Sequence, residues 1–557
     1  MAESAVQQLD ELYEFDRQPV SDDRLLGLGY FIGSFSGEHV AATEFVIGAN
    51  FVNWGATVED VFVGLLIGNL MAVLTWALLC APVAVDTRLT LYWYLRGIAG
   101  PAFTLVYNVL NAVLFCILAG AMVTVSASAV RIPFGIAPQV NWYPDDLRFV
   151  VVVLGVGGVV TALAILGFKK LASFATVCSP WMLLMFVSGA FVMLPEIGRA
   201  SGVGAIDSVG SFFEAARLSI WTGVTPDGSE PMGFWKIAAF AWICNLAMHG
   251  GLSDMALFRY AKKSSYGLAS VFGMFLGHYM AWICAGVMGA GAAVVLNRGL
   301  TTLDSGEVAY QALGWAGIVA VVIAGWTTSN PTLYRAGLAL QAVTPNWSRA
   351  RVTLVAGALT TVIACFPFVF TRLLDFIGIY GLLLAPPGAI VLTEHYIFPR
   401  IGLQRYWVHR RQMRLSWPAV ITWGASIALA LGLERSGTLH LFYLFLPTYL
   451  FASVVYIVLA KMAGAGAHAG EEEPLDYTDG GPQAAAPKPR GSGKANALAG
   501  VVALVALITS VGMPFGVWME WTTLETVRQW LIVPTLVYFV AGAVFYSSWR
   551  RNTDPAG

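Results

Sequence analysis

The chain has 557 residues, of which 57% are hydrophobic and only 12% are charged, and its formal net charge is −1. Its mean hydropathy is +0.69, whereas a soluble protein carries about 25% charged residues, so the composition predicts a polytopic all-α membrane protein. No basic segment is dense enough to bind nucleic acid. The six cysteines form no Cys-x-x-Cys pair, so neither a disulfide framework nor a zinc site is indicated.

The first membrane-length stretch, residues 25–50, carries polar residues where the centre of the bilayer should be. About 20 apolar residues suffice to cross the hydrocarbon, but the middle reads GSFSGEH and ends in Glu38 and His39. A charge at that depth costs roughly 2.5–3.5 kcal/mol, and non-helical backbone is tolerated there only inside protein or beside a cavity. We therefore predict a broken helix that lines a binding site. The alternative is a continuous, kinked helix in which Glu38 and His39 satisfy each other.

Apolar runs of about 18 residues or more predict fourteen membrane helices in total, arranged as twelve plus two. They lie near residues 27–50, 61–85, 101–130, 148–167, 172–194, 234–257, 266–295, 313–341, 352–370, 373–396, 417–433, 439–460, 496–517 and 529–547. A short surface helix is expected around 209–220. Lysine and arginine concentrate in alternate loops, so the positive-inside rule places both termini in the cytoplasm.

The sixth stretch, residues 234–257, repeats the unusual pattern of the first. It holds Asn245, His249 and the Gly250-Gly251 pair inside a span-length run. The two stretches are five helices apart and therefore inverted, and interrupted segments at corresponding positions of two inverted halves point to the central site of a transporter. This pattern predicts a 5+5 inverted repeat of the LeuT type with discontinuous helices 1 and 6. The alternative for each stretch is a kink without function.

Three segments resemble the nucleobase–cation symporter family, which includes cytosine permeases and hydantoin and allantoin transporters. They are LSDMALFRYAKK at 252–263, GWTTSNPTLYRAGLAL at 325–340 and APPGAIVLTEHY at 385–396. The second is the most specific. The resemblance covers spans one to ten and implies the LeuT-type fold and cation-coupled uptake. The last two spans lie outside the usual twelve of the family.

The resemblance also implies a sodium site on the eighth span. Thr327, Thr328 and the carbonyl of Ala324 one turn earlier offer hard oxygen atoms, the ligand type that suits unpolarisable cations. In the resembling transporters, two carbonyls of the broken first helix complete the shell, and these map to about Gly33 and Ser36. The alternative is that the threonines bond to preceding carbonyls of their own helix.

The predicted substrate site draws polar residues from three spans: Glu38, His39, Asn245, His249 and Asn330. The resemblance adds Phe115 and Trp242 as aromatic residues that would hold a flat ring. We favour Glu38 as a substrate-binding carboxylate, with His39, His249 or a coupling proton as its other possible partners. Asp254 and Arg259 are expected to form a structural or gating ion pair.

The sequence thus predicts a secondary active symporter, not an enzyme, which imports a small polar nitrogenous heterocyclic solute with sodium across the plasma (inner) membrane. One alternative is a transporter of the same fold for an amino acid, amine or vitamin, coupled to protons through Glu38; another is a membrane-embedded receptor or sensor. Small-molecule substrate and lipid are the expected partners, and the oligomeric state is left open.

The predicted units are a tail (1–24), the transport core (25–396), helices 11–12 (397–461), a disordered cytoplasmic linker (462–495) and two extra helices with a tail (496–557).

Overall fold

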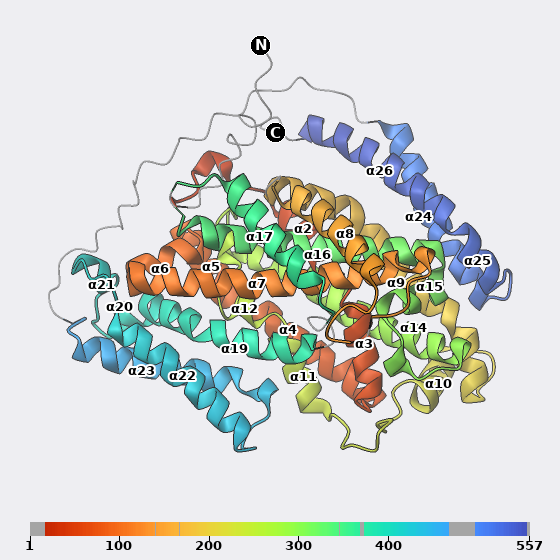
Figure 1. The fold of residues 1–557 in the computed structure, drawn as a ribbon, viewed down its shortest axis with the longest axis horizontal. Coiled ribbons are helices and arrows are strands. Elements are labelled where there is room, and N and C mark those ends of the chain that lie inside the picture. The colour runs from red at the N-terminus through yellow and green to blue at the C-terminus, as the bar shows by residue number, and fades with distance from the viewer. Residues whose placement is uncertain are drawn as a thin grey trace, which may run out of the picture.

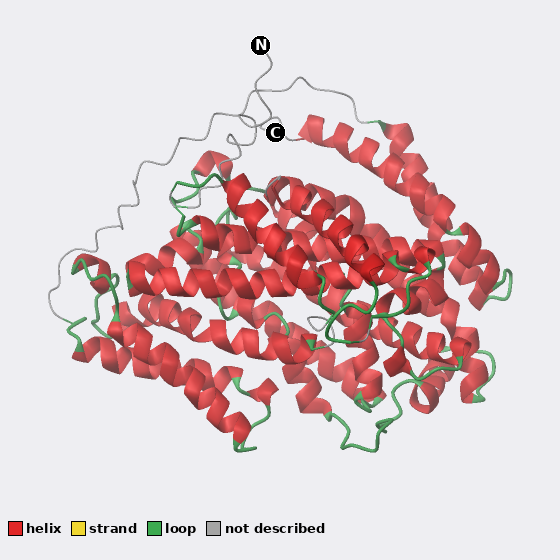
Figure 2. Ribbon diagram, viewed as in Figure 1, coloured by secondary structure: helices red, strands yellow, loops and turns green. Residues whose placement is uncertain are grey.

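The computed structural model describes residues 17–139, 141–165, 168–344, 346–367, 372–466 and 496–553. Within these ranges the chain is helical (Figure 1), and pairing of extended backbone is limited to two isolated bridges, Leu26 with Ala261 and Thr57 with Thr222. Figure 2 shows the helices joined by loops and turns of different lengths. Most of the predicted N-terminal tail and of the predicted linker lies outside the described residues.

The helices that correspond to the first five predicted spans begin with an interrupted pair. They are α2 (Leu28–Glu38) and α3 (Glu44–Asn53), the helix Asp60–Thr87 with α4 (Leu65–Thr75) and α5 (Ala81–Thr87), α6 (Leu91–Ala99), α7 (Pro101–Val130), α8 (Leu147–Ile165) and α9 (Phe168–Ser201). After α9 comes the predicted surface helix, α10 (Val209–Ser219), which begins at a capping box formed by Ser208 and Ser211.

The next five spans repeat this order. They comprise α11 (Phe234–Ile243), α12 (Leu246–His249) and α13 (Met255–Phe258), the helix Ser264–Leu296 that ends in α14 (Met280–Leu296), α15 (Ser305–Leu313), α16 (Trp315–Gln341), α17 (Arg349–Ala364) and α19 (Leu373–Leu392). The chain continues through α20 (Phe398–Arg400), α21 (Trp407–Arg410), α22 (Trp417–Arg435), α23 (Phe445–Met462), α24 (Ala497–Trp518), α25 (Leu524–Trp530) and α26 (Ile532–Thr553).

Ten helices of the described chain are long and apolar enough to cross a membrane, so the predicted number of fourteen is not confirmed. The first and sixth stretches are interrupted, and α17 has only 16 residues. The helix α16 has 27 residues, but its polar Thr327–Thr332 run lowers its hydropathy. The segments that fall short of a membrane span in length or hydropathy include those for which the sequence predicts substrate or cation binding.

The long helix α9, the fifth span, packs against helices of both repeats and against the C-terminal helices. It contacts α2 and α14, and it also contacts α24 and α26. Figure 1 shows α24, α25 and α26 along one edge of the molecule, with α22 and α23 at the opposite edge. The hydroxyl of Tyr538 in α26 donates to the carbonyl of Val177 in α9 at 2.8 Å. The extra pair is therefore attached to the fifth predicted span.

The glycines of the first stretch serve close packing. A Cβ on Gly33 would lie 2.2 Å from Oγ1 of Thr176, and one on Gly37 would lie 2.5 Å from Cβ of Ala175, both on α9. This small-xxx-small spacing lets two membrane helices approach closely. The interruption therefore does not fall at these glycines, because α2 runs through both and ends at Glu38.

Candidate substrate and cation site

Both predicted interruptions are present. The first lies between Glu38, the last residue of α2, and Glu44, the first residue of α3. The second lies between α12 and α13, where Leu252 adopts a positive φ of 60°. A branched side chain rarely adopts this conformation, and such strain persists only where the surrounding structure holds it. The interrupted ends leave backbone groups outside the helical ladder, as an ion or substrate site requires.

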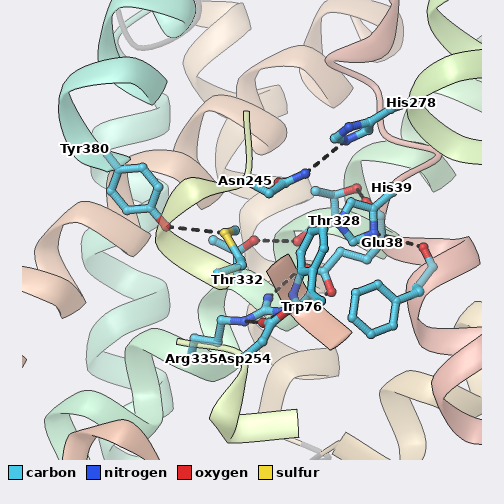
Figure 3. A network of polar contacts seen from close by, with 12 residues as sticks. Glu38, His39, Trp76, Asn245, Asp254, His278, Thr328, Thr332, Arg335 and Tyr380 are labelled. Atoms are coloured by element: carbon cyan, nitrogen blue, oxygen red, sulfur yellow. Dashed lines mark hydrogen bonds and ion pairs between the residues drawn. The ribbon is translucent and has the colours of Figure 1, made fainter. Parts of the chain in front are cut away.

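A buried cluster of three charged side chains joins the two interruptions (Figure 3). Arg335 of α16 donates from Nη1 and Nη2 to the two carboxylate oxygens of Glu38, at 2.6 and 3.1 Å. Its Nε and Nη2 also donate to Oδ1 of Asp254, at 2.8 and 2.5 Å. Nε1 of Trp76 donates to the other Asp254 oxygen at 2.7 Å. The side chains of Arg335 and Asp254 are 0% exposed and that of Glu38 is 4% exposed.

This cluster corrects two predictions. The partner of Glu38 is Arg335, which was not among its predicted partners although it lies within the family-like segment. Asp254 does not pair with Arg259, because its two oxygens bind Arg335 and Trp76. Arg259 donates to the hydroxyls of Tyr260 and Tyr334. With Glu38 and Asp254 ionised, the cluster carries one more negative than positive charge.

Three buried histidines surround this cluster. The ring of His39 lies edge-on to Trp76, with 5.7 Å between centroids, and the ring of His249 lies 4.9 Å from the same indole. His278 lies 5.2 Å from His39. Asn245 contacts Nε2 of His278 through its side-chain nitrogen at 3.3 Å. The structure therefore brings four of the predicted site residues, Glu38, His39, Asn245 and His249, into one region.

A further buried carboxylate, that of Glu44, was missed by the sequence analysis. Glu44 is the first residue of α3 and is 1% exposed. Nε1 of Trp282 donates to it, and its Oε1 lies 3.7 Å from Nε2 of His278. The sequence signal was an acidic residue at the start of a half-helix, where the helix dipole stabilises negative charge.

The threonine pair of α16 faces the end of α2. Oγ1 of Thr328 donates to the carbonyl of Glu38 at 2.5 Å and also lies 3.1 Å from the carbonyl of Ala324. Oγ1 of Thr327 lies 3.1 Å from the carbonyls of Ile323 and Ala324. Three oxygen atoms from two helices thus meet at Thr328, and they are of the type that can hold a small hard cation.

The two carbonyls predicted to complete the cation site differ in availability. Gly33 lies a full turn inside α2, where its carbonyl belongs to the helical ladder. Ser36 lies in the last turn, where carbonyls lack intrahelical donors. The carbonyl that contacts Thr328 is that of Glu38, two residues beyond Ser36.

The predicted aromatic pair has other partners. Phe115 lies 5.6 Å from Tyr380, edge to face, whereas Trp242 lies 5.0 Å from Phe445 and donates from Nε1 to Thr75. Across the residues that the structure describes, no ring contact joins Phe115 and Trp242. Asn330 donates to the carbonyl of Trp326 in its own helix, at 2.8 Å.

No protein-family model matches the sequence, and a search of curated proteins found no match. Solved structures do match. Mhp1, a nucleobase-cation-symport-1 family transporter in a closed conformation with bromovinylhydantoin bound, aligns with a TM-score of 0.60 and 16% identity, over 81% of this chain and 96% of that one. Mhp1 in an inward-facing conformation gives 0.58 and 16%, over 81% and 95%.

A Na+-coupled sialic acid symporter in a substrate-bound outward-open state aligns with a TM-score of 0.55 and 12% identity, over 82% of this chain and 95% of that one. At these identities the comparison establishes the fold. The chain has the LeuT-type transporter fold that its two interrupted helices predict.

Proposed function

We propose that the chain belongs to the nucleobase–cation symporter family and imports a small polar, nitrogenous heterocyclic solute together with sodium. The fold of a hydantoin-binding transporter and of a Na+-coupled symporter supports this proposal. So do the interruptions in the two inverted halves, because half-helix ends supply the backbone groups that bind substrate and ion in such transporters.

The contact between Thr328 and Glu38 is the single observation that carries the cation part of the proposal. It joins α16 to the broken end of α2 through oxygen atoms alone: Oγ1 of Thr328 and the carbonyls of Ala324 and Glu38. In this proposal, sodium binds among these oxygens with the help of Thr327, and its binding fixes α2 against α16. Ser36 provides a second α2 carbonyl, and Gly33 remains a weaker candidate.

The substrate part of the proposal assigns a different role to Glu38 than the sequence did. Both of its carboxylate oxygens already bind Arg335, so Glu38 holds the site together and sets its charge. Direct contacts with the substrate are proposed for four side chains near Trp76 and the sixth-span interruption, namely His39, Trp242, Asn245 and His249. Phe115 and Asn330 are proposed as further contacts.

A second candidate function is proton-coupled uptake by the same fold. The observation that favours it is the ratio of two buried carboxylates to one guanidinium in the cluster of Glu38, Asp254 and Arg335. A proton on one carboxylate would balance that charge without any sodium ion.

The positive-inside pattern further supports a multi-pass protein of the plasma (inner) membrane with both termini in the cytoplasm.

Uptake by purified protein in liposomes separates these functions. Radiolabelled nucleobases and hydantoins are offered with a sodium gradient, with a proton gradient or with neither. The proposal expects accumulation only with sodium and its loss in the Thr328→Ala variant. Accumulation driven equally well by a proton gradient in the absence of sodium favours the second function, and absence of flux under every gradient contradicts both.

A further inference from the structure

The hydrogen-bond donors of four side chains in this region, Arg335, Trp76, Trp242 and Thr328, are already used within the protein. Each guanidinium nitrogen of Arg335 bonds a carboxylate, and the indole N–H groups of Trp76 and Trp242 bond Asp254 and Thr75. The hydroxyl of Thr328 donates to a carbonyl. A ligand that offers only acceptors, such as a carboxylate, would therefore have to displace an existing bond from these groups.

Two hydrogen-bond acceptors on histidine rings, in contrast, remain without a partner among the described residues. Nδ1 of His39 bonds the carbonyl of Phe35 at 3.0 Å, and Nε2 of His249 bonds the carbonyl of Trp242 at 2.9 Å. A carbonyl only accepts, so these two nitrogens carry the protons of the neutral rings, and the opposite nitrogens are acceptors. Nε2 of His39 and Nδ1 of His249 are buried and have no hydrogen-bond partner among the described residues.

Asn330 follows the same logic. Its Nδ2 donates to the carbonyl of Trp326, so its Oδ1 is the free atom, and this oxygen is also buried without a partner in the described chain. Buried polar atoms of native proteins are nearly always hydrogen-bonded. Two of these unused acceptors lie on rings that both pack against Trp76, where the N–H groups of one ligand could pair with them.

The charge of the region points to the same kind of ligand. Glu38 and Asp254, both buried, share one guanidinium, so the pair carries a net negative charge when both are ionised. Excess negative charge is costly in a low-dielectric interior. A cation that donates hydrogen bonds satisfies both the charge and the free acceptors.

We propose that the site around Trp76 takes a cationic nitrogen base, a planar amine or amidine whose N–H groups donate to Nε2 of His39 and Nδ1 of His249. This inference rests on the proposed transport function and narrows its substrate class. It disfavours carboxylate solutes, which lack donors and repeat the charge that is already present. Glu38 and Asp254 act at a distance by stabilising the bound positive charge.

Three near-isosteric probes test the proposal: benzamidine is a cation with four N–H groups, benzamide is neutral, and benzoate is an acceptor-only anion. Binding to the full chain in lipid nanodiscs is measured by competition and by thermal shift, because a ligand stabilises the fold to which it binds. We expect affinity to fall from benzamidine to benzamide to benzoate, with roughly 10-fold or more between the first and last, the scale of a charge-assisted hydrogen bond.

Matched variants identify the acceptors. His39→Phe and His249→Phe keep a flat ring but remove the acceptor, so the preference for benzamidine should fall by roughly 10-fold. His39→Gln places an oxygen near the position of Nε2, and His249→Asn places one near Nδ1, so these variants should retain the preference. His409→Phe, at an exposed position, is the control for loss of a histidine elsewhere.

The outcomes separate this inference from the proposed function. Equal or tighter binding of benzoate, an unchanged preference in both phenylalanine variants, or no binding of any probe by folded protein overturns the inference. Sodium-driven uptake of a heterocycle in the same preparations would leave the transport function intact. If benzamidine binds through the histidines but no solute ever crosses the membrane, the transport proposal fails and the assignment of the site stands.

Discussion

Replacing Arg335 with methionine keeps a long, flexible side chain but removes the guanidinium that binds both Glu38 and Asp254. Two carboxylates whose side chains are 4% and 0% exposed would then be buried without a countercharge. Breaking a buried ion pair by removing one partner costs about 3–5 kcal/mol, and here one substitution breaks two pairs. We therefore expect Arg335→Met to cost at least about 3–5 kcal/mol of folding free energy.

Glu38→Gln is the informative comparison. It removes one charge-assisted interaction, worth about 1.5–3 kcal/mol, but Arg335 keeps its two bonds to Asp254, at 2.8 and 2.5 Å. The remaining pair is also charge-balanced, which offsets part of the loss. The expected order of apparent melting temperature in detergent is wild type, then Glu38→Gln, then Arg335→Met.

A triple variant sharpens this test. Combining Arg335→Met with Glu38→Gln and Asp254→Asn removes all three charges, and replacing a whole buried ionic cluster by neutral groups is often close to neutral for stability. The triple variant should melt above Arg335→Met alone. A Glu38→Gln protein that melts as low as Arg335→Met, together with a triple variant that recovers nothing, would refute the charge argument.

Three further predictions concern other parts of the structure. Thr327→Ala combined with Thr328→Ala should abolish the rise in melting temperature that sodium causes, measured by titration with sodium against potassium; an unchanged rise in the folded double variant contradicts the cation site. Gly37→Leu should lower thermal stability because a Cβ already lies 2.5 Å from Ala175, whereas Gly29→Leu, with no atom within 4 Å of its Cβ, should have little effect; equal melting of the two variants contradicts the packing argument. A chain that stops after residue 466 should lose stability, because α9 loses the Tyr538 bond, but should keep the wild-type affinity for ligand in equilibrium binding; complete loss of binding by folded truncated protein contradicts it.

The sequence predicted the fold well because its signals are local. Membrane-length apolar runs and polar residues in two apolar stretches each identify an element without reference to the rest of the chain. A glycine in an apolar stretch does not by itself predict whether the helix is interrupted there. Gly33 and Gly37 weaken a helix, but they also permit close helix packing, and only the position of α9 decides between the two effects.

The partners of the charged residues could not be predicted in the same way. Glu38 ends α2, Asp254 lies in the interruption before α13 and Arg335 lies in α16. The two carboxylates lie 297 and 81 residues from Arg335 in sequence. The nearby Arg259 was the natural local partner for Asp254. The bonding of Asp254 to Arg335 depends on how α16 packs against both interruptions, which no local pattern encodes.

The contact between α2 and α9 is made by small residues, and this affects how the two helices can move relative to each other. Helices whose long side chains interdigitate slide past each other only if many rotamers change together, which opposes motion. At Gly33 and Gly37, α2 presents bare backbone to Ala175 and Thr176, so a sliding or swivelling displacement there disturbs few rotamers. Shear of this kind between packed helices is a common way to change conformation. This packing favours a tilt of α2, the half-helix that ends at the charged cluster, as a rigid unit relative to α9. In such a motion α9 would keep its position against α26, to which it is bonded through Tyr538.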